Sequence, residues 1–458
     1  MTDRVRPFRP FRPRAVLPGA LLLLALAWGA PAGAAGPAPA GDAALAASLE
    51  RLVQGGGVIV GEAGGVVLAY ERGRYIPASI VKLATALTAL EELGPDFRFR
   101  TEFYLDAGRT LYVRGYGDPF LVSEEWALIA AELAAAGAFG QPLAGLVLDT
   151  SALADDLEVD GASESLNPYD ARLGALVSNF NTVFVRVAPG GEVVSAEPQT
   201  PLTPLARELA ADLEPGEHRI NLSVEPGHAL RHTGELALAI LGQAGARFAG
   251  GWRTGRVPGG LAPLLTHRNS RPLTEVVRGM LEYSNNFIAN QVVLALGLRA
   301  TGEPATLAAG VARVERFLTG RLGLADRDVR LAEGSGLSRR NRITLAGMLR
   351  VVDAFYPWRG LMRVYGKPPF EARAKSGTLN GVHTMAGFLP GPQGARRGFV
   401  IMLNQPRNNR HWVFRALVRA FGEPAEGPGA DAWPAAHAQP PEGHPAATPV
   451  QTSALTGR

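Results

Sequence analysis

The chain has 458 residues, 47% hydrophobic and 19% charged, a composition that can fill sizeable cores and excludes wholesale disorder. It contains no cysteine, which excludes a disulfide scaffold, a thiolate metal site and a cysteine nucleophile. The formal net charge of +4 arises in the first 14 residues, where five arginines stand against one aspartate. The rest of the chain is neutral overall, so its charge does not indicate a nucleic-acid partner.

The N-terminus has the three parts of a secretory signal. The arginines precede an apolar stretch over residues 20–28, and the small residues Ala32-Gly33-Ala34 follow it. The apolar stretch is shorter than the about 20 residues that a membrane-spanning helix needs. We therefore predict a signal peptide over residues 1–34 and a mature protein that is periplasmic or otherwise extracytoplasmic, without a stable transmembrane segment. Retention of the segment as an uncleaved anchor is the alternative.

The C-terminal residues 423–458 contain seven prolines and nine alanines. Such a segment buries too little apolar surface to offset the entropy of ordering it. We predict a disordered tail, with binding to the cell wall as an alternative role.

Between these ends, hydrophobic patterning predicts an α/β chain. Short strands around residues 58–68 precede a helix over 79–92, in which apolar residues recur every three or four positions. Residues 101–261 mix short strands, among them 103–105, 111–113 and 183–185, with a helix over 124–136. Helices return after Leu273, and a strand over 398–403 and a helix over 412–421 close the pattern. The simplest arrangement is one domain built from both chain ends, with an insertion between them.

The first candidate for chemistry is Ser79-Ile80-Val81-Lys82. Spacing of three puts the serine and the lysine on one face of the predicted helix. The helix N-terminus favours developing negative charge, and a lysine among apolar groups can lose its proton and act as a base. Taken alone, the same pattern also fits an ordinary N-cap serine.

Two further polar clusters follow later in the chain. Ser284-Asn285-Asn286 separates two amphipathic helices and offers a hydroxyl to relay a proton and an amide to hold a substrate, or simply a loop with an N-cap. Lys375-Ser376-Gly377-Thr378 begins a pattern of strands and offers a cation and two hydroxyls for a carboxylate, or an exposed edge strand with solvated side chains. Gly377 lets a ligand approach the strand backbone closely.

The order Ser-x-x-Lys, Ser-x-Asn and Lys-hydroxyl-Gly is that of the serine penicillin-recognising enzymes. Over residues 55–421 the chain resembles one branch of them, the D-alanyl-D-alanine carboxypeptidase/endopeptidase family of class C low-molecular-mass penicillin-binding proteins. Matches outside the three motifs carry this resemblance: Tyr75-Ile76-Pro77-Ala78 before Ser79, Leu93-Gly94-Pro95-Asp96, Gly115-Tyr116-Gly117-Asp118-Pro119, Ser178-Asn179-Phe180-Asn181 and Gly334-Ser335-Gly336-Leu337-Ser338-Arg339.

The resemblance implies a fold of class α/β (α+β): a serine transpeptidase-like core with an antiparallel sheet flanked by helices. A large inserted α/β region separates the first two motifs, since Ser284 follows Ser79 by 205 residues. We therefore expect residues 35–100 and 262–422 to form the catalytic domain and residues 101–261 the insertion.

The resemblance also implies the chemistry, which is cleavage of the D-Ala-D-Ala bond, or of a D-Ala-diamino acid bond, in peptidoglycan stem peptides. Ser79 is the expected nucleophile, Lys82 the base and Ser284 the proton relay. Asn286 holds the substrate amide, and the N–H groups of Ser79 and Thr378 form the oxyanion hole. Lys375, Ser376 and Thr378 bind the terminal carboxylate. β-Lactams are expected to bind, and neither a metal nor an organic cofactor is expected.

Three positions depart from the family pattern. Ser376 stands where threonine is usual, although the hydroxyl is retained. Asn290 replaces a frequent acidic residue, and the sequence suggests no role for it. Residues 149–164 lack the aromatics that often help relatives to bind the free end of the peptide side chain, which leaves the preferred diamino acid open.

Two other functions remain consistent with the sequence. A β-lactamase or esterase would share the motifs, but the long insertion argues against it. A non-catalytic peptidoglycan-binding protein would not need the intact motif residues. Zinc hydrolysis is not indicated, because the eight histidines include no His-Glu-x-x-His pair. His383 is expected on a strand surface, and Gly334-Ser335-Gly336 lacks the spacing of a nucleophile elbow.

Overall fold

The computed structural model describes residues 40–422 except 63–64, 72, 156, 163–170, 224, 226, 368–369 and 392–395. The predicted signal peptide (1–34) and the predicted disordered tail (423–458) lie outside the described residues. Within the described part of the chain, no helix is both long enough and apolar enough to cross a membrane.

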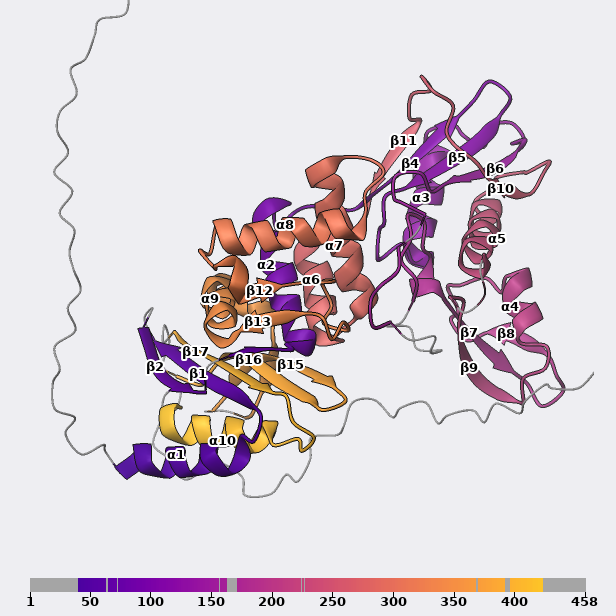
Figure 1. Ribbon diagram of the computed structural model, residues 1–458. Helices are drawn as coiled ribbons and strands as arrows, with labels where there is room; N and C mark the ends of the chain where they lie inside the picture. Colours follow the sequence, from indigo (N-terminus) through magenta and orange to yellow (C-terminus); the bar gives the residue numbers. More distant parts are fainter. Residues whose placement is uncertain are drawn as a thin grey trace, which may run out of the picture.

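A six-stranded sheet built from both ends of the chain forms the centre of the catalytic part (Figure 1). Its order is β14-β15-β16-β17-β1-β2, and every neighbouring pair is antiparallel. β1 lies directly beside β17, with Val58 opposite Ile401. The predicted antiparallel sheet is therefore confirmed. The strands are β14 (Arg363–Tyr365), β15 (Ala372–Leu379), β16 (Val382–Phe388), β17 (Arg397–Leu403), β1 (Gly56–Glu62) and β2 (Gly65–Tyr70).

Helices cover both faces of this sheet because its central strands are apolar on both sides. In β1, Ile59 packs into one core, whereas Val58 and Val60 pack into the other. α1 (Ala40–Leu52) and α10 (Arg410–Phe421) cover the second face. The first face carries α2 (Lys82–Glu92) and α9 (Leu345–Phe355), with α6 (Leu273–Glu282), α7 (Asn286–Thr301) and α8 (Leu307–Gly320) behind them (Figure 1).

The segment between the first two motifs forms separate layers. A five-stranded sheet, β10-β6-β5-β4-β11, is antiparallel at β5–β4–β11 and parallel at β10–β6–β5. α3, which fulfils the helix predicted at 124–136, packs against this sheet through the buried Trp126. The elements are β4 (Arg100–Leu105), β5 (Thr110–Gly115), β6 (Gly145–Asp149), β10 (Trp252–Thr254), β11 (Leu265–Arg268), α3 (Ser123–Ala135) and α5 (His228–Gln243).

Two small sheets complete the fold. The order β8-β7-β9 lies at the far end of the inserted segment, with α4 beside it. The order β12-β13-β3 joins the chain just before Ser79 to the segment around residue 340. Their elements are β8 (Val193–Ser195), β7 (Thr182–Val187), β9 (Gly216–Asn221), α4 (Pro204–Leu209), β12 (Val329–Arg330), β13 (Arg342–Thr344) and β3 (Arg74–Tyr75), and short 3₁₀ turns are η1 (Ala78–Val81), η3 (Asn179–Asn181), η4 (Asp326–Asp328) and η5 (Tyr356–Leu361).

Candidate active site

Ser79 and Lys82 lie at the start of the central helix, where η1 passes into α2. Ser79 is in the 3₁₀ turn, and Lys82 is the first α-helical residue. Ser79 is partly exposed, and the Nζ atom of Lys82 lies 3.0 Å from its Oγ. The predicted sharing of one helical face thus gives direct contact between the hydroxyl and the amine.

Lys82 is completely buried and has three hydrogen-bond acceptors around its Nζ. Besides Ser79 Oγ, these are Asn286 Oδ1 at 2.7 Å and the Ser335 carbonyl at 2.6 Å. Burial lowers the pKa of Lys82 to about 7, although the nearby carboxylate of Glu333 raises it. A neutral lysine keeps a lone pair, which can point at the Ser79 hydroxyl while two N–H groups serve the other acceptors.

Glu333 organises the loop that supplies the Ser335 carbonyl. Its side chain is fully buried and accepts hydrogen bonds from the backbone N–H groups of Ser335 and Gly336 at 2.7 Å each. The amide of Asn341 donates to the same carboxylate at 2.8 Å. Gly336 has a φ of +93° and packs so close to Ala78 that a Cβ would lie 2.1 Å from the Ala78 carbonyl oxygen. The loop is therefore held tightly against the segment that carries Ser79.

The structure gives Asn290 a role that the sequence did not suggest. Its Nδ2 donates to Glu333 at 3.1 Å, and its Oδ1 accepts from the Gly334 N–H at 2.9 Å. A second carboxylate at this position would face Glu333 in a buried setting, where like charges repel strongly. The amide, by contrast, can donate to Glu333 and accept from the backbone at the same time.

Ser284 lies between α6 and α7, in left-handed backbone geometry with a φ of +53°. The N-cap of α7 is the next residue, Asn285, whose side chain accepts from the Ile288 N–H at 2.9 Å. Ala78, directly before Ser79, has a φ of +47°. Non-glycine residues in this region cost about 1–3 kcal/mol and concentrate at functional sites. Here one of these residues is Ser284 itself, and the other directly precedes Ser79.

The third motif lies on β15, the strand next to η1. β14 pairs only with Ala372–Ala374, so the segment from Lys375 to Thr378 has β16 on one side only. A Cβ on Gly377 would lie 2.6 Å from the Ser79 backbone nitrogen. Glycine thus permits the strand to approach the nucleophile closely.

Lys375 joins the third motif to the second. Its Nζ donates to Ser284 Oγ at 2.8 Å and to the Ser376 carbonyl at 2.6 Å. Burial lowers the pKa of Lys375 well below its ordinary value, and the nearby cations Lys82, Arg410 and Arg363 lower it further. Among the described residues it forms no ion pair with a carboxylate. An anionic ligand would therefore be favoured here.

Arg410, the first residue of α10, is a site residue that the sequence analysis missed. It is 8% exposed, and its Nη1 donates to the Gly377 carbonyl at 2.8 Å and to Thr378 Oγ1 at 2.9 Å. Burial lowers its pKa. The hydroxyl of Tyr365, also missed, donates to Ser376 Oγ at 3.1 Å. Thr378 Oγ1 thus accepts from Arg410, and Ser376 Oγ accepts from Tyr365. The proton of each hydroxyl can therefore be donated to an anion.

Two further expectations can be compared with the structure. His383 is buried rather than on a strand surface, because it faces Pro406 at 3.4 Å instead of solvent. In the region without aromatics, Asp160 accepts from Ser338 and pairs with Arg340 at 3.1 Å. No group of three or more histidine, aspartate or glutamate side chains that could hold a metal ion occurs among the described residues.

Comparison with known proteins agrees with this site. The model of the D-Ala-D-Ala carboxypeptidase 3 (S13) family matches residues 43–210 and 220–359. A D-alanyl-D-alanine carboxypeptidase of Actinomadura sp. (strain R39) is 30% identical over 390 residues, covering 70% of this chain and 72% of the relative. D-alanyl-D-alanine carboxypeptidase DacB of Haemophilus influenzae is 29% identical over 161 residues, 31% of this chain and 33% of the relative.

A solved structure shows the same fold. Penicillin binding protein 4 (dacB) from Haemophilus influenzae superposes with a TM-score of 0.65 at 22% identity, covering 81% of this chain and 97% of the other. The same protein complexed with a β-lactam gives a TM-score of 0.60 at 21% identity, with the same coverage.

The fold and the site, taken with the family match and the curated relative, define a serine hydrolase of the penicillin-recognising class. Within that class, the chain belongs to the D-Ala-D-Ala carboxypeptidase 3 (S13) family. The predicted family and fold class are confirmed. The matched segments include Ser79, Lys82, Ser284 and Asn286 and end before Lys375.

Proposed function

We propose that this chain is a serine D,D-carboxypeptidase/endopeptidase that cleaves the peptide bond after D-alanine in peptidoglycan stem peptides through an acyl-enzyme. The observation that carries the proposal is the Ser79–Lys82 pair, in which a fully buried amine with a pKa of about 7 lies 3.0 Å from a partly exposed hydroxyl. A base poised near neutral pH is what activation of a serine requires.

In acylation, Ser79 Oγ attacks the carbonyl carbon of the penultimate D-alanine while its proton passes to the neutral Lys82. The new Oγ–C bond makes a tetrahedral oxyanion, which the backbone N–H groups of Ser79 and Thr378 stabilise. The C–N bond then breaks. The leaving nitrogen takes a proton from Ser284, which regains one from the lysine that contacts it, Lys375, at 2.8 Å.

The remaining motif residues orient the substrate. Asn286 Oδ1 accepts from Lys82, which leaves its Nδ2 to donate to the substrate amide carbonyl. The terminal carboxylate of the substrate lies against Lys375 and the hydroxyls of Ser376 and Thr378. Arg410 acts as a positioning residue that fixes the hydroxyl of Thr378 and adds a second positive charge.

Deacylation uses water. Lys82 first passes the proton that it took from Ser79 on to Lys375, which restores both amines to their starting states. The water proton then passes to the neutral Lys82 as the water oxygen attacks the ester carbonyl. Lys82 returns this proton to Ser79 Oγ as the C–Oγ bond breaks. A β-lactam resembles the substrate in presenting a strained amide next to a carboxylate, so the same steps give a penicilloyl-enzyme.

We also propose that the enzyme acts outside the cytoplasmic membrane after removal of residues 1–34. The substrate class, which is extracytoplasmic, and the signal pattern support this location. We further propose that residues 35–100 and the chain that follows the insertion belong to the catalytic domain, and the separate sheets of the two parts support this division. β11 pairs with β4 in the sheet of the insertion. We therefore propose that the chain re-enters the catalytic domain after Arg268 rather than at residue 262.

The test is incubation of the exported protein with a fluorescent penicillin and, separately, with purified muropeptides. We expect covalent labelling together with release of D-alanine or of cross-linked partners. Fast turnover of penicillin without muropeptide cleavage would instead indicate a β-lactamase, and muropeptide binding without acylation would indicate a binding protein.

A further inference from the structure

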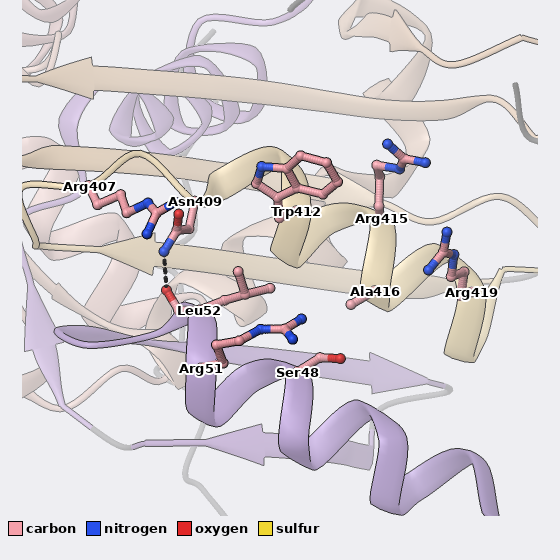
Figure 2. Close-up of a pocket in the computed structure, with 9 residues that line it drawn as sticks. All are labelled: Ser48, Arg51, Leu52, Arg407, Asn409, Trp412, Arg415, Ala416 and Arg419. Carbon is pink, nitrogen blue, oxygen red and sulfur yellow. Dashed lines mark hydrogen bonds between the residues drawn. The ribbon is translucent and has the colours of Figure 1, made fainter. Parts of the chain in front are cut away.

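A basic groove lies on the face of the catalytic domain opposite α2 and α9, between α1 and α10 (Figure 2). It has a volume of about 390 Å³. Trp412, Arg415 and Arg419 line it from α10, at spacings that put them on one side of the helix. Arg51 lines it from α1, and Arg407 from the loop before α10.

The walls of the groove are fixed by the fold. Asn409 Nδ2 donates to the Leu52 carbonyl at 2.8 Å, and Gln405 Nε2 donates to the same oxygen at 3.1 Å. These hydrogen bonds tie the loop before α10 to the C-terminal end of α1. The inner sides of both helices pack into one core through Leu49 and Leu417. The distance between the two arginine-bearing walls is therefore set by buried contacts.

Among the residues that the structure describes, the four arginines of the groove have no acidic partner. The ion pairs formed within the described residues include none of their guanidinium groups. Arg415 instead lies over the ring of Trp412, 5.3 Å from its centroid. Trp412 is 59% exposed, an unusual position for the largest apolar side chain. Concentrated positive charge beside an exposed indole favours an anionic partner with an adjoining apolar layer.

We propose that this groove docks the protein on an anionic membrane surface, with phosphate-bearing lipid headgroups against the arginines and Trp412 at the interface. Indole rings favour the boundary between headgroups and acyl chains, and guanidinium groups bind phosphate in a bidentate manner. Docking through α1 and α10 leaves the other face of the sheet, which carries α2 and α9, turned away from the membrane (Figure 1).

The test is co-sedimentation of the exported protein with vesicles of phosphatidylcholine containing phosphatidylglycerol, and with vesicles of phosphatidylcholine alone. We expect binding to the anionic vesicles only, and its loss at high salt because surface charges are screened. Each basic residue near such a surface contributes about fivefold in partitioning, so Arg415→Glu/Arg419→Glu should lower binding by at least about twenty-five-fold. Trp412→Ala should lower binding at low salt as well.

Arg299→Glu/Arg321→Glu is the matched control, because both arginines are exposed and lie away from the groove, Arg299 in α7 and Arg321 at the C-cap of α8. This variant has the same net charge and should bind almost as wild type does. Equal loss in the two double variants would overturn the proposal, as would binding that ignores lipid charge.

Two results that assign the groove to a different occupant would also overturn the membrane proposal. Concentration-dependent dimerisation that Arg415→Glu/Arg419→Glu abolishes, without vesicle binding, would assign the groove to a second copy. Vesicle binding that appears only after truncation at Gly422 would assign it to the chain's own tail, which carries Glu423, Glu426 and Asp431. The readout does not use peptidase activity, so failure here leaves the proposed function standing, and penicillin labelling of each variant checks that function separately.

Discussion

Arg410 offers a sharp test of how the site recognises a carboxylate. Its guanidinium is buried and contacts Thr378 Oγ1 at 2.9 Å, so a substrate carboxylate on that hydroxyl would lie about 5–6 Å from it. Two unit charges at that separation interact by about 3 kcal/mol at an effective dielectric constant of about 20. Removing the charge should therefore lower kcat/KM by about a hundredfold.

The assay compares two substrates that differ only in charge, a D-Ala-D-Ala peptide ending in a carboxylate and the same peptide ending in a carboxamide. Arg410→Met should lower kcat/KM for the carboxylate substrate by the full factor and for the carboxamide by only about threefold, because the amide has no charge to lose. Arg410→Lys, which keeps the charge but not the paired donors, should lie between Arg410→Met and wild type.

The ratio of the two rates separates recognition from structural damage. Arg410 also bonds the Gly377 carbonyl, so its loss can loosen β15. A loosened strand would slow both substrates alike. Equal falls for carboxylate and carboxamide would refute the carboxylate role and leave Arg410 as a residue that only supports the strand.

Three further predictions concern the same site and the tail. Because Lys82 must be neutral to accept the Ser79 proton, and its pKa is about 7, kcat/KM should fall tenfold per pH unit below that value. Above it, kcat/KM should stop rising and should fall once Lys375, whose pKa is also lowered, loses the proton that it supplies to Ser284. A rate independent of pH from 5 to 8 would contradict the role of Lys82. For a D-Ala-D-Ala peptide, kcat/KM of Ser376→Thr should stay within a few-fold of wild type. kcat/KM of Ser376→Ala should fall at least tenfold, because a hydrogen bond to a charged group is worth roughly 1.5–3 kcal/mol. Equal kcat/KM for Ser376→Ala and wild type would show that Ser376 does not bind the carboxylate. Truncation after Gly422 should leave the melting temperature and the acylation rate nearly unchanged, and a large loss of stability would show that the tail packs on the domain.

Local features of the site could be predicted from the sequence because they depend on short spacing. A serine and a lysine three residues apart meet on any helical turn, and apolar residues at spacings of three and four located α2. The contact between Lys375 and Ser284 joins residues 91 apart in sequence, and only resemblance to a family brought them together in advance.

Arg410, Tyr365 and Glu333 could not be found from sequence in the same way. α10 contains Arg410, Arg415 and Arg419, which look alike in the sequence, and only burial separates the first from the other two. Glu333 lies in a loop, and several of its hydrogen-bond donors are backbone N–H groups, which any residue type can supply and which therefore give no sequence signal. α1 was missed because its many alanines give a weak apolar pattern, although Leu45 and Leu49 are buried.

The central claim is that Ser79 is the acylated nucleophile, and intact-protein mass spectrometry after exposure to benzylpenicillin tests it most directly. The wild-type protein should gain the mass of one penicilloyl group, on the peptide that contains Ser79, and Ser79→Ala should gain none while keeping the wild-type melting temperature. A folded Ser79→Ala protein that still acquires the adduct, or a wild-type adduct on another residue such as Ser335, would contradict the account.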